Sequence, residues 1–323
     1  MAVLEIRDLR VEFHTESGVV KALDGVNLTL EEGEVLGVVG ETGCGKSVTA
    51  QTILKLLPSP PAKITGGEIL LEGRNILDLS EEELGKIRGR KITMIFQEPM
   101  TSLNPVFTVW EQMKDVITLH RGVSKEEAWK IAIEVLKDVR MPDPEGALKK
   151  YPHELSGGQR QRIMIAMALS CRPKILIADE PTTALDVTIQ AQILNLLKSL
   201  QEKYGMSVVL ITHDMGVVAQ VADRVAVMYA GSVVEIGNVE DVLRNPLHPY
   251  TKGLLRAIPT VRKKLERLES IPGSVPNLLD PPSGCRFHPR CSLVKDVCRK
   301  VKPKLKDVDG RLVACHAVRE GWS

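Results

Sequence analysis

The stretch Gly40-Glu41-Thr42-Gly43-Cys44-Gly45-Lys46-Ser47 decides how the rest of this chain is interpreted. It follows an apolar run at 35–39 and precedes a helix-compatible segment at 48–57, so the order is strand, glycine-rich loop, helix. Glycines permit positive φ, which lets successive backbone N–H groups point at one ligand, and the helix N-terminus adds its dipole. Lys46 can then reach the β- and γ-phosphates of a nucleotide, and the Ser47 hydroxyl can bind Mg²⁺. The sequence therefore predicts a nucleotide site at this loop.

The composition fits a folded, soluble chain that is long enough for two or three lobes. Of its 323 residues 43% are hydrophobic and 26% are charged, and a formal net charge of +2 argues against a protein that coats nucleic acid. Residues 1–8 are interrupted by charge, and no apolar run approaches the ~18 residues of a membrane span. We therefore expect a cytosolic chain that reaches a membrane only through a partner.

Strand patterns flank the loop on both sides. Before it, residues 4–13, 19–23 and 26–30 are apolar or alternating, and Phe13 ends the first of these segments. Phe13 is as compatible with stacking on an adenine ring as with a place in the core. After the loop come short strands at 67–73 and 91–96, and the second delivers Gln97 at its carboxyl end, where open α/β sheets place ligands.

From about residue 99 to residue 152 the strand pattern gives way to helical segments, which predicts an all-helical insertion. It ends at Leu155-Ser156-Gly157-Gly158-Gln159, which opens a long helix. A serine and two glycines at a helix N-terminus form a second candidate phosphate-binding end. The alternative is a serine that caps its own helix.

Two further strands end in groups that bear chemistry. The apolar run at 174–178 ends in Asp179-Glu180, and adjacent carboxylates at a strand end point to opposite sides and can hold different roles. Asp179 suits Mg²⁺, and Glu180 suits the deprotonation of an attacking water. A buried strand at 207–212 delivers His213 in the same way, which makes this histidine a catalytic candidate.

In this order the motifs resemble those of the ABC-type ATPases over residues 1–240. The resemblance implies that 40–47 is the Walker A loop, Gln97 the Q-loop, 156–159 the signature and Asp179-Glu180 the Walker B pair with the catalytic base. Asp186 is then the D-loop, His213 the switch histidine and Phe13 the aromatic A-loop residue. The implied catalytic residues are Glu180, His213 and Gln97, and the implied Mg²⁺ ligands are Ser47, Gln97 and Asp179. The implied ATP-binding residues are Phe13, Gly40, Glu41, Thr42, Gly43, Cys44, Gly45, Lys46, Ser47, Val48, Ser156, Gly157, Gly158, Gln159 and Asp186.

Residues 98–105, 245–251 and 284–291 are similar to one branch of that family, the ATP-binding subunits of dipeptide and oligopeptide importers, and nickel importers share these stretches. The resemblance implies two membrane permease subunits, a second ATPase subunit or a self-dimer, and an indirect peptide-binding protein outside the cell. It places the chain peripherally on the cytoplasmic face of the membrane. In such a dimer the signature of one subunit caps the γ-phosphate held by the other.

The C-terminal tail holds Cys285, Cys291, Cys298 and Cys315 among several prolines. In a reducing compartment four clustered thiols favour metal over disulfides. The spacing differs from the paired cysteines of a zinc finger and suits a cubane, whose irons spread the thiolates further. Branch members with this tail resemble holders of a [4Fe-4S] cluster; zinc and four unligated thiols remain alternatives. We expect this tail to pack separately from the Walker A loop.

The predicted fold is therefore an α/β P-loop core with an antiparallel β subdomain, an inserted helical subdomain and a small C-terminal extension. The expected division is 1–97 for the first part of the core, 98–172 for the helical insertion with the signature, 173–240 for the second part of the core and 241–323 for the extension. A soluble ABC ATPase acting on DNA or ribosomes and a metal-sensing regulator are the rival functions. The sequence leaves open the preferred peptide length, nickel specificity, and homodimer against heterodimer.

Overall fold

The computed structural model describes residues 1–97, 102–183, 185–257 and 271–322. The predicted branch motif at 98–105 therefore lies partly outside the described residues. Two compact units make up the chain. The first unit contains Met1, Glu31–Val35 and Asp78–Ile211, and the second unit contains Ala2–Leu30, Leu36–Leu77 and Thr212–Ser323.

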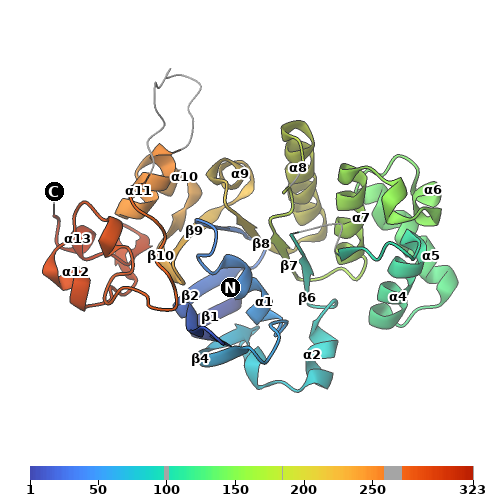
Figure 1. The fold of residues 1–323 in the computed structure, drawn as a ribbon. Coiled ribbons are helices and arrows are strands. Elements are labelled where there is room, and N and C mark those ends of the chain that lie inside the picture. The colour runs from blue at the N-terminus through green and yellow to red at the C-terminus, as the bar shows by residue number, and fades with distance from the viewer. Residues whose placement is uncertain (98–101, 184, 258–270, 323) are drawn as a thin grey trace. The chain divides into compact units, whose positions relative to one another are not determined.

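An antiparallel sheet in the second unit corresponds to the predicted β subdomain (Figure 1). Its strands, in spatial order, are β2 (Gly18–Glu31), β1 (Ala2–Thr15), β4 (Ala62–Leu71) and β5 (Arg74–Asn75). The segments 19–23 and 26–30, expected as two strands, form the single strand β2, because Gly25 adopts a φ of 72° within the strand and lets the chain continue. The short helix η1 (Ile76–Asp78) follows β5.

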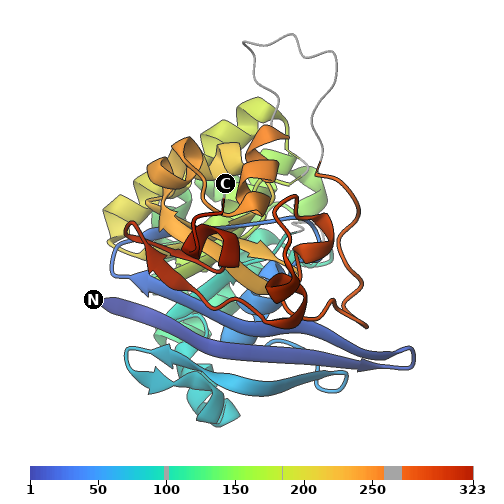
Figure 2. The same ribbon diagram turned by 90° about the vertical axis from the view of Figure 1, so that its left-hand side faces the viewer.

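A second set of strands in this unit carries the glycine-rich loop. β3 (Val35–Val39) runs parallel to β9 (Arg224–Tyr229), and β10 (Ser232–Asn238) returns antiparallel to β9. The sheet continues beyond β10: β12 (Arg311–Val313) from the C-terminal tail pairs with β10, and β11 (Lys306–Val308) pairs with β12 (Figure 2). The helices of the unit are α1 (Lys46–Ile53), α9 (Met215–Val221), α10 (Val239–Arg244), α11 (Pro249–Arg256), η3 (His288–Arg290), α12 (Asp296–Lys300) and α13 (His316–Arg319).

The C-terminal tail also has a small core of its own. Val313, Cys315 and Ala317 are buried together, and Leu247 and Val308 pack against them. The tail therefore extends the sheet and buries apolar surface of its own.

The first unit combines three parallel strands with the predicted helical insertion. β7 (Ile175–Asp179) lies between β6 (Ile92–Ile95) and β8 (Ser207–Thr212), and every residue of β7 is buried, as expected of a central strand. The helices are α2 (Glu81–Ile87), α4 (Val109–Arg121), α5 (Lys125–Asp138), α6 (Pro144–Lys149), η2 (Pro152–Glu154), α7 (Gly157–Leu169) and α8 (Val187–Tyr204), of which α4 to α7 group together in Figure 1.

Candidate functional site

The glycine-rich loop connects β3 to α1, as predicted, and its glycines are needed for its shape. Gly40, Gly43 and Gly45 all have positive φ. A Cβ on Gly40 would lie 2.2 Å from the Met228 carbonyl oxygen, and one on Gly45 would lie 2.6 Å from Leu23. In the described residues no side chain caps the N-terminus of α1. The end of α1 thus has the character of an anion site.

Lys46 is buried within the loop that precedes it. Its Nζ donates to the carbonyl oxygens of Gly40, at 2.7 Å, and Glu41, at 3.2 Å. The neighbouring Cys44 thiol lies 3.7 Å from the same nitrogen, and burial raises the pKa of that thiol, which keeps it neutral. The buried Lys46 ammonium therefore gives the loop a positive charge that suits a phosphate ligand.

The remaining loop residues differ in their contacts. Thr42 is exposed, and Ser47 and Val48 are half-buried in the first turn of α1. Glu41 contacts the C-terminal tail instead: its backbone N–H donates to the Tyr250 hydroxyl at 3.0 Å, and its carboxylate accepts from Arg290 at 2.7 and 3.2 Å. The expectation that the tail packs separately from this loop is therefore wrong.

Sequence reasoning gave Tyr250 and Arg290 no role, although both lie in stretches that it associated with peptide importers. Tyr250 is fully buried, and its ring lies 4.5 Å from that of Tyr229. The position of Tyr250 follows from Glu235 on β10, which is fully buried and accepts the backbone N–H groups of Leu247 and His248 at 3.0 and 2.9 Å. His248 then caps α11 by accepting from the Tyr250 N–H, and burial lowers the pKa of His248 to about 3.

Phe13 and His213, two further predicted residues, also lie in the second unit. Phe13 is half-buried near the end of β1, opposite Ala62 of β4. His213 is exposed at the turn between β8 and α9, where Asp214 caps α9 by accepting from Gly216 at 2.7 Å. The predicted place of His213 at a strand tip is confirmed, and its role stays a prediction.

In the first unit the structure brings Gln97 and Glu180 together. Gln97 Nε2 donates to Glu180 Oε2 at 3.0 Å, and Thr183 Oγ1 donates to the same oxygen at 2.9 Å. The pairing of β6 with β7, with Ile95 opposite Ala178, places their carboxyl ends side by side. Asp179 is buried at the end of β7, whereas Glu180 has a φ of 46°, a strained backbone geometry that is typical of functional positions. Thr183 was not predicted.

The signature serine caps its own helix. Ser156 Oγ accepts from the Gln159 N–H at 3.3 Å, and the Ser156 N–H donates to Gln159 Oε1 at 3.0 Å, which is a complete capping box. Gly157 and Gly158 form the first turn of α7, and a Cβ on Gly158 would lie 3.1 Å from Ile189. Asp186 likewise caps α8, accepting from the Ile189 N–H at 2.9 Å.

The four tail cysteines lie near one another without forming disulfides. The Cys285 N–H donates to the Cys298 carbonyl oxygen at 2.8 Å. Burial raises the pKa of Cys285 to about 12, and the charges of Cys315, Cys291 and Cys298 add to this rise. Within the described ranges, no three His, Cys, Asp or Glu side chains are arranged to hold a metal ion. Cys298 and Cys315 are buried, Cys285 and Cys291 are half-buried, and binding of a metal group to these thiols would displace their protons.

No helix in the described part of the chain is long and apolar enough to cross a membrane.

The chain is similar to known families and proteins over nearly its whole length. Residues 23–183 match the ABC transporter family, and residues 234–298 match the C-terminal region of oligopeptide/dipeptide transporters. A probable peptide ABC transporter ATP-binding protein of Sinorhizobium fredii is 52% identical over 97% of this chain and 94% of its own length. The oligopeptide transport ATP-binding protein OppD of Escherichia coli is 50% identical over 97% of this chain and 93% of its own length.

Solved structures show the same fold. The dimeric ABC transporter cassette MJ0796 covers 73% of this chain and 98% of its own, with 35% identity and a TM-score of 0.65. A second structure of that cassette, in a post-hydrolysis state with ADP and phosphate, is 34% identical, with the same coverage and a TM-score of 0.65. With its α/β fold, its glycine loop and nearly full-length relatives, this chain belongs to the ABC transporter family, in the branch of the peptide transporter ATP-binding proteins.

Proposed function

We propose that this chain binds and hydrolyses ATP to energise the import of dipeptides or oligopeptides through an ABC transporter. The observation that carries the proposal is the buried Lys46 ammonium at the centre of the glycine loop. Two carbonyl oxygens are weak partners for an ammonium, and the phosphates of ATP would replace them with charged ones. The peptide substrate follows from the names of the relatives, which match nearly the whole chain.

Each site residue takes one role in this proposal. Lys46 binds the β- and γ-phosphates, and Ser47, Gln97 and Asp179 hold Mg²⁺. Glu180 polarises the attacking water, and its bonds to Gln97 and Thr183 fix the direction of its carboxylate before ATP arrives. The other roles are adenine stacking by Phe13, γ-phosphate sensing by His213, and contact with ATP of a second subunit by 156–159 and Asp186.

The partners follow from the same family membership. Two permease subunits form the path through the membrane, a second ATPase subunit completes the dimer, and a peptide-binding protein outside the cell supplies the substrate. The chain itself lies on the cytoplasmic face of the membrane. ATP closes the ATPase dimer, hydrolysis reopens it, and the helical insertion after Gln97 passes this motion to the permeases.

The test is ATP titration calorimetry combined with uptake measurements in cells that lack the native gene. Lys46→Ala should remove ATP binding, because a triphosphate loses its main cationic partner, and should also abolish uptake of a labelled dipeptide. Uptake of nickel in place of dipeptide would replace the peptide assignment. Unchanged ATP affinity in Lys46→Ala would show that the glycine loop is not a nucleotide site.

We also propose that Cys285, Cys291, Cys298 and Cys315 hold a [4Fe-4S] cluster. Such a group would supply four thiolate bonds that close the tail on itself. Protein purified without air should be brown, absorb near ~400 nm and contain about four irons per chain. Cys298→Ser, which changes a buried thiol, should lose the colour. Colourless protein with one zinc per chain would assign zinc instead, and protein without metal would leave four packed thiols.

A further inference from the structure

The C-terminal extension contacts both the backbone N–H and the carboxylate of Glu41 in the glycine loop. The Glu41 N–H donates to Tyr250, its carboxylate accepts from Arg290, and its carbonyl oxygen accepts from Lys46. Every polar group of this residue is therefore occupied. Because the loop binds phosphate through the aim of its peptide N–H groups, fixing Glu41 also fixes the loop.

The pair between Arg290 and Glu41 is bidentate and largely removed from water. The side chain of Arg290 is 5% exposed and that of Glu41 is 29% exposed. Arg290 is itself held by the Ile271 and Pro272 carbonyl oxygens, at 3.3 and 2.9 Å. Burial by itself would lower the pKa of the Arg290 guanidinium, but the hydrogen bonds to Glu41 and Tyr229 raise this pKa above its ordinary value.

The charge of Glu41 gives this pair its consequence for ATP. A carboxylate in a phosphate-binding loop repels a triphosphate, and charges closer than ~8 Å are poorly screened at physiological salt. Arg290 cancels that charge without leaving the tail. The fold thus places a carboxylate in the loop and its counter-charge in a segment 249 positions away in sequence.

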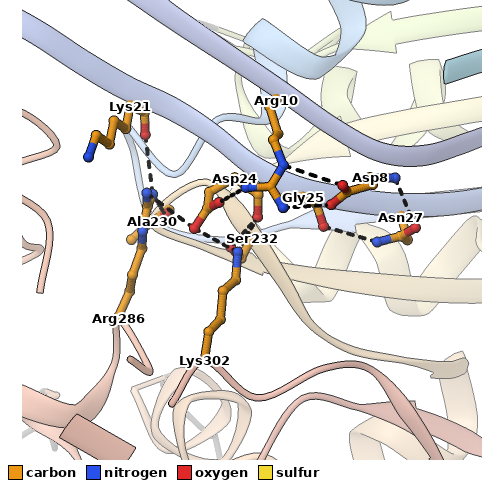
Figure 3. Close-up of polar contacts among 10 residues, drawn as sticks. All are labelled: Asp8, Arg10, Lys21, Asp24, Gly25, Asn27, Ala230, Ser232, Arg286 and Lys302. Atoms are coloured by element: carbon orange, nitrogen blue, oxygen red, sulfur yellow. Dashed lines mark hydrogen bonds and ion pairs between the residues drawn. The ribbon is translucent and has the colours of Figure 1, made fainter. Parts of the chain in front are cut away.

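A second set of hydrogen bonds connects the extension to the same loop. Arg286 donates to the Ala230 carbonyl oxygen at 2.5 Å, and the next residue, Gly231, donates its N–H to the Cys44 carbonyl oxygen at 2.8 Å. Arg286 and Lys302 also pair with Asp24 on β2, as Figure 3 shows. Gly231 leaves no room for a side chain, since a Cβ would lie 2.4 Å from the Ala22 carbonyl oxygen.

We propose that Arg290 is a positioning residue for nucleotide binding, which neutralises and orients Glu41, so that the C-terminal extension sets the affinity of the loop for ATP. This inference rests on the proposed ATP site. It makes the extension a part of the nucleotide site.

Titration calorimetry of MgATP into the full chain tests the inference. Arg290→Met should weaken ATP binding about 10-fold, because it leaves the Glu41 carboxylate without its charged partner. Raising the salt concentration should shrink this difference. Glu41→Gln should bind ATP more tightly than the parent, since it removes the repelling charge of this loop residue and keeps the positive charge of Arg290. The double variant, Arg290→Met with Glu41→Gln, should recover most of the lost affinity.

A purely structural Arg290 predicts a different pattern. The double variant would then bind as weakly as Arg290→Met, and that result overturns the inference. Unchanged ATP affinity in Arg290→Met also overturns the inference. So does unchanged or weaker ATP binding in Glu41→Gln, and this second variant tests the inference even where Arg290→Met fails to fold. Arg299→Met, the same change at an exposed arginine of the extension, is the matched control. Lys46→Ala distinguishes failure of the proposed ATP site from failure of the proposed role of Arg290. If Lys46→Ala still binds ATP, the assignment of the nucleotide site is wrong. If Lys46→Ala loses ATP binding but the Arg290 and Glu41 variants bind as the parent does, only the role of Arg290 is wrong.

Discussion

Replacing Glu235 by Ala should be one of the most destabilising single changes in β10, the strand with which β12 of the extension pairs. Its carboxylate is fully buried on β10 and accepts two backbone N–H groups, at 3.0 and 2.9 Å, while Arg311 lies 3.7 Å away. A hydrogen bond to a charged group contributes about 1.5–3 kcal/mol. Removing one partner of a buried pair costs about 3–5 kcal/mol, and Glu235→Ala should lower the free energy of unfolding by this amount.

Urea denaturation measures this loss. Glu235→Gln keeps one acceptor oxygen, so its loss should be about half as large, roughly 1.5–3 kcal/mol. Glu240→Ala is the matched control, because the exposed Glu240 pairs with Arg244, four residues on, and such pairs contribute less than about 0.5 kcal/mol. A loss below about 1 kcal/mol in Glu235→Ala would show that water replaces the carboxylate and that the turn at 247–248 does not depend on it.

Three further predictions concern catalysis, the signature and pH. Glu180→Gln should bind ATP normally and lower the rate of hydrolysis by about 10²–10⁴-fold, since the amide still accepts from Gln97 and Thr183 but cannot act as a base. A phosphate-release assay measures this rate, and hydrolysis within a few-fold of the parent would refute the prediction. Ser156→Ala should lose the helix cap and lower the free energy of unfolding, measured by urea denaturation, by about 1 kcal/mol. Mixing Ser156→Ala subunits with Lys46→Ala subunits should restore part of the ATPase activity, because the mixed dimer has one intact composite site. If Ser156 only caps α7, the mixture should show no recovery. Burial alone would raise the pKa of Asp24, but Lys302, Arg286 and Arg10 lower it below its ordinary value. The Asp24 carboxylate therefore stabilises the fold above about pH 4, and this stabilisation is lost as the pH falls through the lowered pKa. The difference in unfolding free energy between the parent and Asp24→Asn should shrink in acid, and a difference that stays constant would contradict this sign.

Local pattern was enough for the parts of the site that lie within one strand, loop and helix. The glycine spacing at 40–47 requires positive φ, and the structure has it at Gly40, Gly43 and Gly45. The apolar run before Asp179 predicted a buried central strand, and β7 is one. In both cases the deciding physics is backbone sterics and the burial period of a few neighbouring residues, which the sequence displays directly.

Contacts between distant segments were decided only by the tertiary structure. Gln97 meets Glu180 because β6 pairs with β7, and no spacing in the chain states which strands pair. Glu235 is a charged residue in an otherwise apolar strand, yet it is fully buried, because β12 of the tail pairs with β10 at this position and the turn at 247–248 supplies its donors. Arg290 and Glu41 became partners in the same way. A charged side chain shows in sequence what it can bind, whereas the partner that it finds depends on which surfaces the fold brings together and removes from water.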